Sequence, residues 1–134
     1  MGYSKWINLH LTNDLEGPLA VQNAQLLHGK FYANDDKDDE ITPDQVDEIV
    51  IPESGSGDIY SCGRHGVPVG TRGSFDLVDK DTLQKICTIN WSSPYNGGSN
   101  YVLASDVDRH YRVGVPAVSA EGPVGFADIS VAEW

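Results

Sequence analysis

The sequence predicts an all-β fold, a single-domain antiparallel β-sandwich that spans residues 1–134. Apolar residues recur with a period near two rather than 3.6 along many short runs, as in half-buried strands. The chain also holds 14 glycines and 7 prolines, and turns that carry them separate the runs. Finally, 134 residues supply one hydrophobic core but are too few for two domains.

The first expected strand occupies residues 3–12, where apolar and polar side chains alternate. Ile7, Leu9 and Leu11 face one side together with Tyr3, whereas Trp6 falls on the opposite, polar side. Similar short runs follow at 47–51, 58–62, 74–79, 84–91, 100–105, 110–115 and 125–134. Short strands separated by such turns are typical of a sandwich or a barrel.

One helical turn is expected, within "TPDQVDEI" at residues 42–49. Thr42 is a suitable cap, and Pro43 fits the first helical position because its missing N–H is unpaired there in any case. The sequence shows no internal repeat and no long linker.

An unusual feature is "NDDKDDE" at residues 34–40, a run of acidic residues broken by one lysine. An EF-hand loop that started at Asp36 would need Gly and Glu where the sequence has Ile41 and Asp47. A solvated loop is therefore the favoured interpretation, and a calcium site of another kind is the alternative.

The formal net charge of −11 and the pI of about 4.4 exclude some classes of partner. Such a surface repels nucleic-acid phosphates and anionic lipids, so we expect no nucleic-acid partner. No run approaches the roughly 20 apolar residues of a membrane-spanning helix. The start of the sequence also lacks the apolar region of a signal peptide. We therefore expect a soluble protein, secreted or released without a visible signal.

Catalytic and metal-binding motifs are absent from the sequence. It has no G-x-S-x-G, no H-E-x-x-H and no P-loop, and its four histidines show no metal-ligand spacing. We expect no enzymatic activity, no cofactor and no metal. Cys62 and Cys87 are too few for a Cys-based zinc site. Two free thiols are favoured over a cross-strand disulfide.

The placement of the aromatic residues stands out. Trp91 and Tyr95 flank "SSP" beside the glycine-rich turn "NGGSN". Exposed rings near loop tips can hold a quaternary ammonium by cation–π attraction or lie at a membrane interface. Ordinary packing is the alternative, and for Trp91, inside a strand-like run, burial is favoured. A different function class also remains open, a carbohydrate-binding sandwich in which Trp and Tyr stack on sugar rings.

Four segments, in one order along the chain, resemble the aegerolysins, small acidic proteins of fungi and bacteria. They are "SKWINLHL", "HGKFYANDDKDDEI", "SCGRHGVPVGTRGSFDLVD" and "INWSSPYNGGSN". The third is the most specific, and it is similar to the family pattern "CGR…GT-x-G-[ST]-FDLVD". The second is similar to the family's acidic "DKD" loop between two strands, which favours the solvated-loop interpretation of residues 34–40.

The resemblance implies a β-sandwich without enzymatic activity that recognises membrane lipids. The lipids are typically sphingolipids: sphingomyelin with cholesterol, or ceramide phosphoethanolamine. It further implies the binding half of a two-component cytolysin, in which a larger partner of the membrane-attack-complex/perforin type builds the pore. Pairs of this kind include insecticidal toxins.

The candidate lipid-binding residues follow from the matched segments and the aromatic pattern. The membrane-facing surface is expected to include Trp6, His28, Val69, Trp91 and Tyr95, and the candidate phosphate donors are Arg64 and Arg72. For Arg64 the alternative is that it only pins its own loop. Sphingomyelin/cholesterol readers in the family tend to carry an acidic residue where this chain has Val69. We therefore expect a preference for ceramide phosphoethanolamine or another invertebrate-type sphingolipid.

Overall fold

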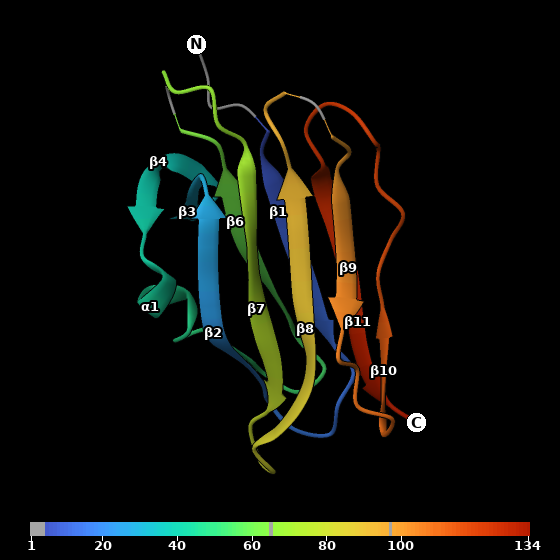
Figure 1. The fold of residues 1–134 in the computed structure, drawn as a ribbon. Helices are drawn as coiled ribbons and strands as arrows, with labels where there is room; N and C mark the ends of the chain where they lie inside the picture. The colour runs from blue at the N-terminus through green and yellow to red at the C-terminus, as the bar shows by residue number, and fades with distance from the viewer. Residues whose placement is uncertain (1–4, 65, 97) are drawn as a thin grey trace.

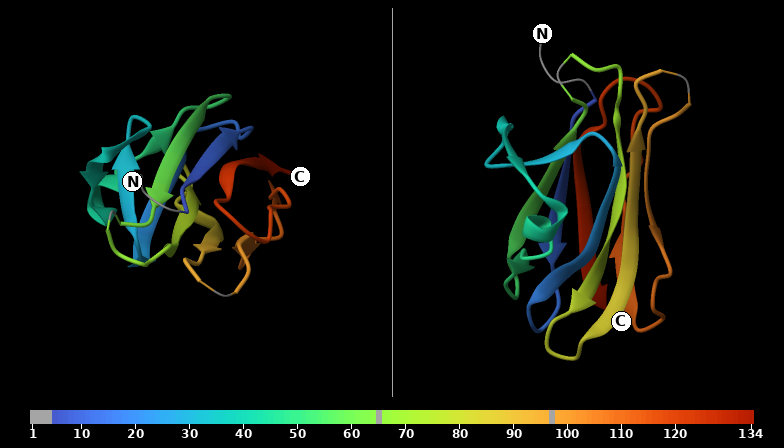
Figure 2. Two further views of the ribbon diagram at one scale, coloured as in Figure 1. Left: turned by 90° about the horizontal axis from the view of Figure 1, so that it is seen from above. Right: turned by 60° about the vertical axis from the view of Figure 1, so that its left-hand side comes forward.

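A computed structural model describes residues 5–64, 66–96 and 98–134. Two β-sheets face each other, as the sequence predicts (Figures 1 and 2). Sheet A has the strand order β10-β11-β1-β6-β3-β4, and sheet B has the order β5-β2-β7-β8-β9. The strands are β1 (Ile7–Asn13), β2 (Leu19–His28), β3 (Lys30–Ala33), β4 (Asp36–Ile41), β5 (Val50–Ile51), β6 (Ser56–Cys62), β7 (Thr71–Asp79), β8 (Gln84–Ser93), β9 (Tyr101–Ser105), β10 (Tyr111–Gly114) and β11 (Gly125–Glu133).

The two sheets enclose one hydrophobic core, built by the alternation in the sequence. Ile7, Leu9 and Leu11 of β1 are fully buried, whereas the residues between them are half-exposed. Tyr3, expected on the same face, lies outside the described residues. Strand β1 pairs in parallel with β11 and antiparallel with β6. The other described ladders of both sheets are antiparallel.

The predicted helical turn is confirmed. Helix α1 (Pro43–Val46) starts after Thr42, whose hydroxyl accepts a hydrogen bond from the Gln45 backbone N–H at 3.2 Å. The Gln45 side chain in turn accepts from the Thr42 backbone N–H at 2.8 Å. This capping box satisfies two N–H groups that a helix start otherwise leaves unpaired.

The prediction of a loop at residues 34–40 is wrong for most of that segment. Asn34 and Asp35 form the turn with positive φ, and Asp36–Ile41 is strand β4 at the edge of sheet A. The side chains remain solvated, which is why the segment looks like a loop in the sequence. Charged side chains on an edge strand also oppose pairing with another chain. Within the described residues, no three His, Cys, Asp or Glu side chains are grouped to hold a metal ion.

Cys62 and Cys87 are free and buried, so the favoured interpretation of two unbridged thiols is confirmed. Burial raises the pKa of Cys62 to about 11 and that of Cys87 to about 12. Among the described helices, none has the length and apolar content needed to cross a bilayer.

Candidate functional site

A cavity of about 290 Å³ opens at the end of the sandwich where β2 and β8 end and β7 begins, the upper end in Figure 1. Four of the sequence-predicted residues line it, namely His28, Val69, Arg72 and Tyr95. The remaining lining residues are Pro68, Gly70, Thr71, Ser92, Pro94 and Asn96. Segments far apart in the sequence therefore meet at one site.

Strand register brings the polar side chains of the cavity together. His28 pairs with Arg72, and Arg72 pairs with Ser92 on the next strand. Tyr95, just beyond the end of β8, keeps 42% of its surface exposed. Among the described residues that line the cavity there is no Asp or Glu, and Val69 is one of them. The ionisable side chains of the lining are therefore Arg72, His28 and Tyr95.

Arg72 is available to a ligand. Its side chain is exposed, and within the described part of the chain it forms no salt bridge. A guanidinium in this state can donate two parallel hydrogen bonds to a phosphate.

Arg64 differs from Arg72 in both respects. It does not line the cavity, and its guanidinium donates two hydrogen bonds to the Glu40 carboxylate, at 3.2 and 3.0 Å. The side-chain hydrogen bond from Arg64 lowers the pKa of Glu40. Arg64 thus ties strand β4 to the segment that follows β6, rather than pinning only its own loop.

The placement of Trp91 on a membrane-facing surface is wrong. Its side chain is 0% exposed, and it packs against Phe31 and Phe75 at centroid distances of 5.7 and 5.8 Å. The indole N–H donates to the Thr71 hydroxyl at 2.9 Å. Trp91 thus supports the cavity floor from inside the core, as its strand-like context favours.

Trp6 is half-buried and does not line the cavity. It lies on the outer side of sheet A, and the Lys37 ammonium is 5.4 Å from its ring centroid. The contact is a cation–π pair within the chain. The structure therefore brings four of the seven candidate residues together and leaves Trp6, Arg64 and Trp91 outside the cavity.

Two glycines allow the strands to meet beneath the cavity. Gly29 has φ of +90°, and an added Cβ would lie 2.4 Å from the Cys62 carbonyl oxygen. An added Cβ at Gly70 would lie 1.9 Å from the Ser93 carbonyl oxygen. A side chain at either position would force the backbones apart, so both glycines serve close packing at this end.

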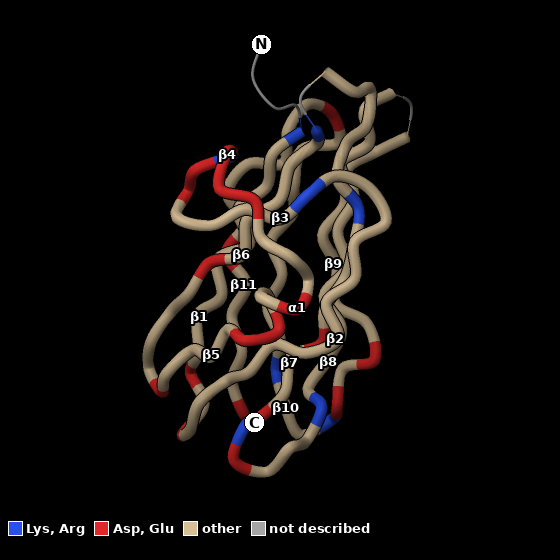
Figure 3. The backbone as a smooth tube through the Cα atoms, turned by 90° about the vertical axis from the view of Figure 1, so that its left-hand side faces the viewer, with Lys and Arg blue, Asp and Glu red and all other residues tan. Residues whose placement is uncertain are grey.

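The charges of the molecule are unevenly distributed (Figure 3). Lys and Arg gather at the end that holds the cavity, both signs are mixed at the opposite end, and Asp and Glu predominate along β4. The cavity therefore lies in the locally less acidic part of a strongly acidic protein. An anionic group can approach it despite the net charge of −11.

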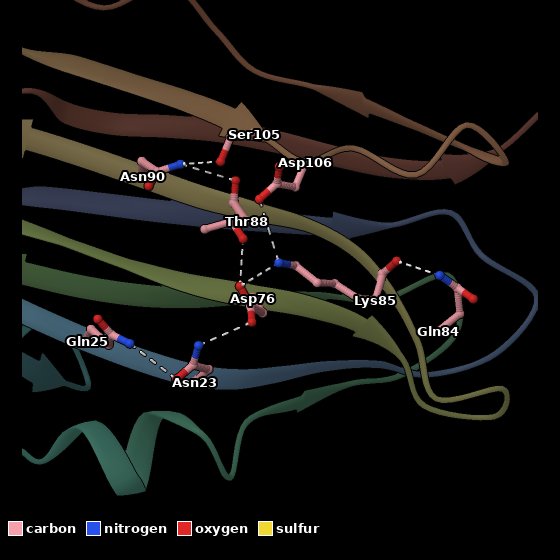
Figure 4. A network of polar contacts seen from close by, with 9 residues as sticks. All are labelled: Asn23, Gln25, Asp76, Gln84, Lys85, Thr88, Asn90, Ser105 and Asp106. Carbon is pink, nitrogen blue, oxygen red and sulfur yellow. Dashed lines mark hydrogen bonds and ion pairs between the residues drawn. The ribbon is translucent and has the colours of Figure 1, made fainter.

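Farther from the cavity, the outer face of sheet B carries an internally bonded polar network (Figure 4). The Asp76 carboxylate accepts from the Thr88 hydroxyl at 2.7 Å and lies 3.6 Å from the Lys85 ammonium. Asn90 donates to the Ser105 hydroxyl at 2.9 Å. The nine residues drawn include no aromatic ring, so this network itself offers no platform on which a sugar could stack.

Sequence reasoning did not select Thr71, Ser92 or Asn96 as site residues. Thr71 and Ser92 adjoin selected residues, and pairing the "GTRGSF" strand with the "NWSSP" strand would have placed them together. Asn96 lies in the turn after Tyr95 and has no comparable signal in the sequence.

Comparisons with known proteins agree with the fold and the matched segments. The family model described as Aegerolysin matches residues 4–133. The chain belongs to the aegerolysin family. Its relatives include Asp-hemolysin of Aspergillus fumigatus, 35% identical over 131 residues, which cover 96% of this chain and 93% of that protein. Terrelysin of Aspergillus terreus is 31% identical over 137 residues, which cover 99% and 93% of the two chains.

A solved structure shares the aegerolysin architecture seen here. The crystal structure of RahU protein in complex with a Tris molecule superimposes with a TM-score of 0.91. The two chains are 28% identical, with 99% of this chain and 98% of RahU covered. The two-sheet arrangement is thus also found in an experimental structure.

Proposed function

We propose that this aegerolysin is a non-enzymatic membrane-lipid-binding protein whose end cavity holds the phosphorylated headgroup of a sphingolipid. The observation that carries the proposal is the meeting around one cavity of His28, the exposed Tyr95 and Arg72, which forms no salt bridge with a described residue. The hemolysin and lysin names of its relatives support an action at membranes.

The headgroup phosphate would be held by Arg72. A guanidinium matches the oxygens of a phosphate, and His28 adds an N–H donor beside it. A cavity without Asp or Glu does not repel the phosphate. Trp6 and Tyr95 would rest at the membrane interface, where amphipathic rings are favoured.

The chemistry of the remaining lining favours ceramide phosphoethanolamine over sphingomyelin with cholesterol. With Val69 in place of a carboxylate, no lining charge attracts the headgroup ammonium. A primary ammonium compensates by donating hydrogen bonds to neutral acceptors such as the Ser92 hydroxyl and the Asn96 amide oxygen. The quaternary ammonium of sphingomyelin has no N–H and gains only the cation–π attraction of Tyr95.

We further propose that the protein is the targeting subunit of a two-component pore-forming toxin. A membrane-spanning strand needs about 9–11 residues with apolar outward positions. The long strands here bury their apolar sides in the sandwich core, so unzipping them would destroy the headgroup site. The pore-forming strands would therefore come from a larger perforin-like partner, and an insect target fits the proposed lipid.

A liposome co-sedimentation panel tests the lipid proposal. Vesicles of phosphatidylcholine would carry ceramide phosphoethanolamine, sphingomyelin with cholesterol, or neither, and a glycan screen would run beside them. We expect the strongest sedimentation with ceramide phosphoethanolamine. Stronger binding to sphingomyelin with cholesterol would contradict the headgroup assignment. Binding to glycans alone would replace lipid recognition with a carbohydrate-binding function.

A further inference from the structure

A second cavity, of about 350 Å³, lies beside the end cavity at the same end of the sandwich. It opens between the residues that follow β8 and the segment that precedes β11, which lie near each other at the upper end in Figure 1. We call this space the loop cavity. Tyr95 and Asn96, together with Pro94, line both cavities and so form the wall that the two share.

One buried side chain of the loop cavity is held in a fixed orientation. Asn100 is 8% exposed, and its amide nitrogen donates to the carbonyl oxygens of Ser119 and Gly122, at 2.9 and 2.7 Å. Because both N–H groups face carbonyl acceptors, turning the amide around would place oxygen against oxygen. The fold therefore fixes where the Asn100 side-chain oxygen lies.

This Asn100 oxygen is left without a donor. No described residue hydrogen-bonds to it, and unlike the unpartnered Asn8 oxygen it is not sealed from solvent. Because Asn100 lines the loop cavity, its oxygen can accept a hydrogen bond from a ligand there. An acceptor oriented in this way favours a ligand that carries O–H or N–H groups.

The two charged side chains of the loop cavity have opposite signs. Lys5 is half-buried and Glu121 is exposed, and neither forms a salt bridge with a described residue. The lining thus carries no net charge, and it offers hydrogen-bond donors at Lys5 and Asn96 beside acceptors at Glu121 and Asn100. This balance favours a neutral ligand with hydroxyl groups, which both donate and accept.

An aromatic ring stands next to these polar groups. Tyr95 is exposed and lines the loop cavity. An aromatic ring offers a flat apolar surface. A pyranose ring has an apolar C–H face that matches such a surface, and its hydroxyls lie around the edge. The combination of Tyr95 with oriented acceptors therefore suits a sugar better than it suits a simple anion or an apolar molecule.

We propose that the loop cavity binds a neutral hexose. The apolar face of the sugar packs against Tyr95, and its hydroxyls donate to the Asn100 oxygen and the Glu121 carboxylate. Two sources carry this chemistry, a soluble glycan and the sugar headgroup of a glycolipid. The proposal goes beyond the phosphate site, because Arg72 and His28 take no part in it.

A nuclear magnetic resonance titration with the methyl glycosides of glucose, galactose and mannose tests the site. We expect at least one of them to shift the backbone amides of residues 94–96, 98–100 and 119–122, with a dissociation constant on the order of 1–10 mM. The control is tetrahydropyran-2-methanol, which has the same ring without the ring hydroxyls. It should bind at least tenfold more weakly, because it cannot satisfy the acceptors of the lining.

Two variants separate this site from the lipid site. Glu121→Ala should weaken glycoside binding about tenfold, while it leaves sedimentation with ceramide phosphoethanolamine vesicles unchanged. Arg72→Ala should do the reverse, because Arg72 lines only the end cavity. Glu53→Ala is the matched control for the loss of one exposed carboxylate, and it should change neither reading. All three variants should melt near the parent temperature, since the three side chains are exposed.

A vesicle experiment distinguishes the two sources of the hexose. Phosphatidylcholine vesicles would carry glucosylceramide or galactosylceramide, with and without an excess of the soluble glycoside that binds. Sedimentation that the glycoside inhibits would assign the site to a glycolipid. Glycoside binding without sedimentation would assign it to a soluble glycan.

Three results would overturn the hexose assignment. One is the failure of all three glycosides to bind, and another is equal binding of tetrahydropyran-2-methanol. The third is glycoside binding that Arg72→Ala abolishes and Glu121→Ala preserves, which would move the sugar into the end cavity.

Discussion

The hydroxyl groups of Ser61 and Thr71 hydrogen-bond across the interface between the two sheets. This bond is the middle one of three hydrogen bonds that run from Trp91 to Lys30, and the two outer bonds decide which hydroxyl donates in it. The Trp91 indole can only donate, and it donates to Thr71. Ser61 donates to the Lys30 carbonyl oxygen at 2.7 Å, so the Thr71 proton must go to Ser61. Four residues on four strands are thereby linked beneath the end cavity.

Replacing Thr71 with Val should destabilise the protein, because it keeps the shape but leaves the buried Trp91 N–H without an acceptor. We expect a loss of about 1–3 kcal/mol in the free energy of unfolding. For a chain of this size this corresponds to a fall of roughly 3–12 °C in the melting temperature. Thr71→Ser, which retains the hydroxyl, is the control, and equal melting of the two variants would refute the role of the bond.

Replacing Arg72 with Ala should weaken binding to ceramide phosphoethanolamine vesicles. Losing a charged hydrogen bond of about 1.5–3 kcal/mol predicts binding at least tenfold weaker in co-sedimentation. Arg64→Ala is the matched control, because that arginine already bonds to Glu40 and does not line the cavity. If the Arg64 variant lost binding and the Arg72 variant kept it, the assignment of the phosphate site to Arg72 would be wrong.

The Glu40–Arg64 pair should make a small contribution to the free energy of unfolding, and this contribution should be lost in acid. The pKa of Glu40 is lowered from 4.5 in the folded protein, so its contribution is complete above that value and lost as the pH falls through the lowered pKa. Because both side chains are largely exposed, we expect Glu40→Gln to cost at most about 1 kcal/mol near pH 6. The gap in unfolding free energy between parent and variant should close toward about pH 2. A gap that widened in acid would contradict this assignment.

The two thiols should be inert in the native protein. With pKa values of about 11 and 12, and with both side chains buried, hardly any reactive thiolate is present near neutral pH. An Ellman assay at about pH 8 should detect no thiol in the native state and both after denaturation in guanidinium. Rapid reaction of one native thiol would show that its strand opens.

The purified protein should bind vesicles without releasing an encapsulated dye. Leakage should require a perforin-like partner, because the long strands of this chain bury their apolar sides in the sandwich core and cannot also form a membrane-spanning barrel. Tyr95→Ala should reduce binding and partner-dependent leakage in parallel, since binding comes first. Efficient release by the isolated chain would refute the two-component proposal.

The sequence predicts the regular parts of the fold well, because burial on one face of a strand leaves a period of two. That signal recovers β1 and β6 to β11 to within a few residues. It fails for β2, where register shifts between Gln22 and Gln25 and again near His28 interrupt the alternation. It also fails for β4, because an edge strand with both faces solvated has no apolar side to reveal.

The candidate site was predictable only in part. The resemblance to the family motifs selected His28 and Arg72 separately. The strand register then places these two residues side by side. The exposure of an aromatic ring cannot be inferred from its position in a strand-like run, so Trp91 was misplaced although its burial was favoured. The bond between Arg64 and Glu40 joins residues 24 positions apart, and no hydrophobic periodicity or motif in the sequence indicates it.

The parallel pairing of β1 with β11 has a consequence for biosynthesis. These strands come from opposite ends of the described chain yet lie side by side in the interior of sheet A. While a ribosome is still making β11, the growing polypeptide exposes one whole edge of β1 and an incomplete core. Closure of the sheet must therefore await β11, and the contacts that complete it join residues far apart in the sequence. Contacts of such long range slow folding, and until they form the unpaired edge of β1 is open to aggregation.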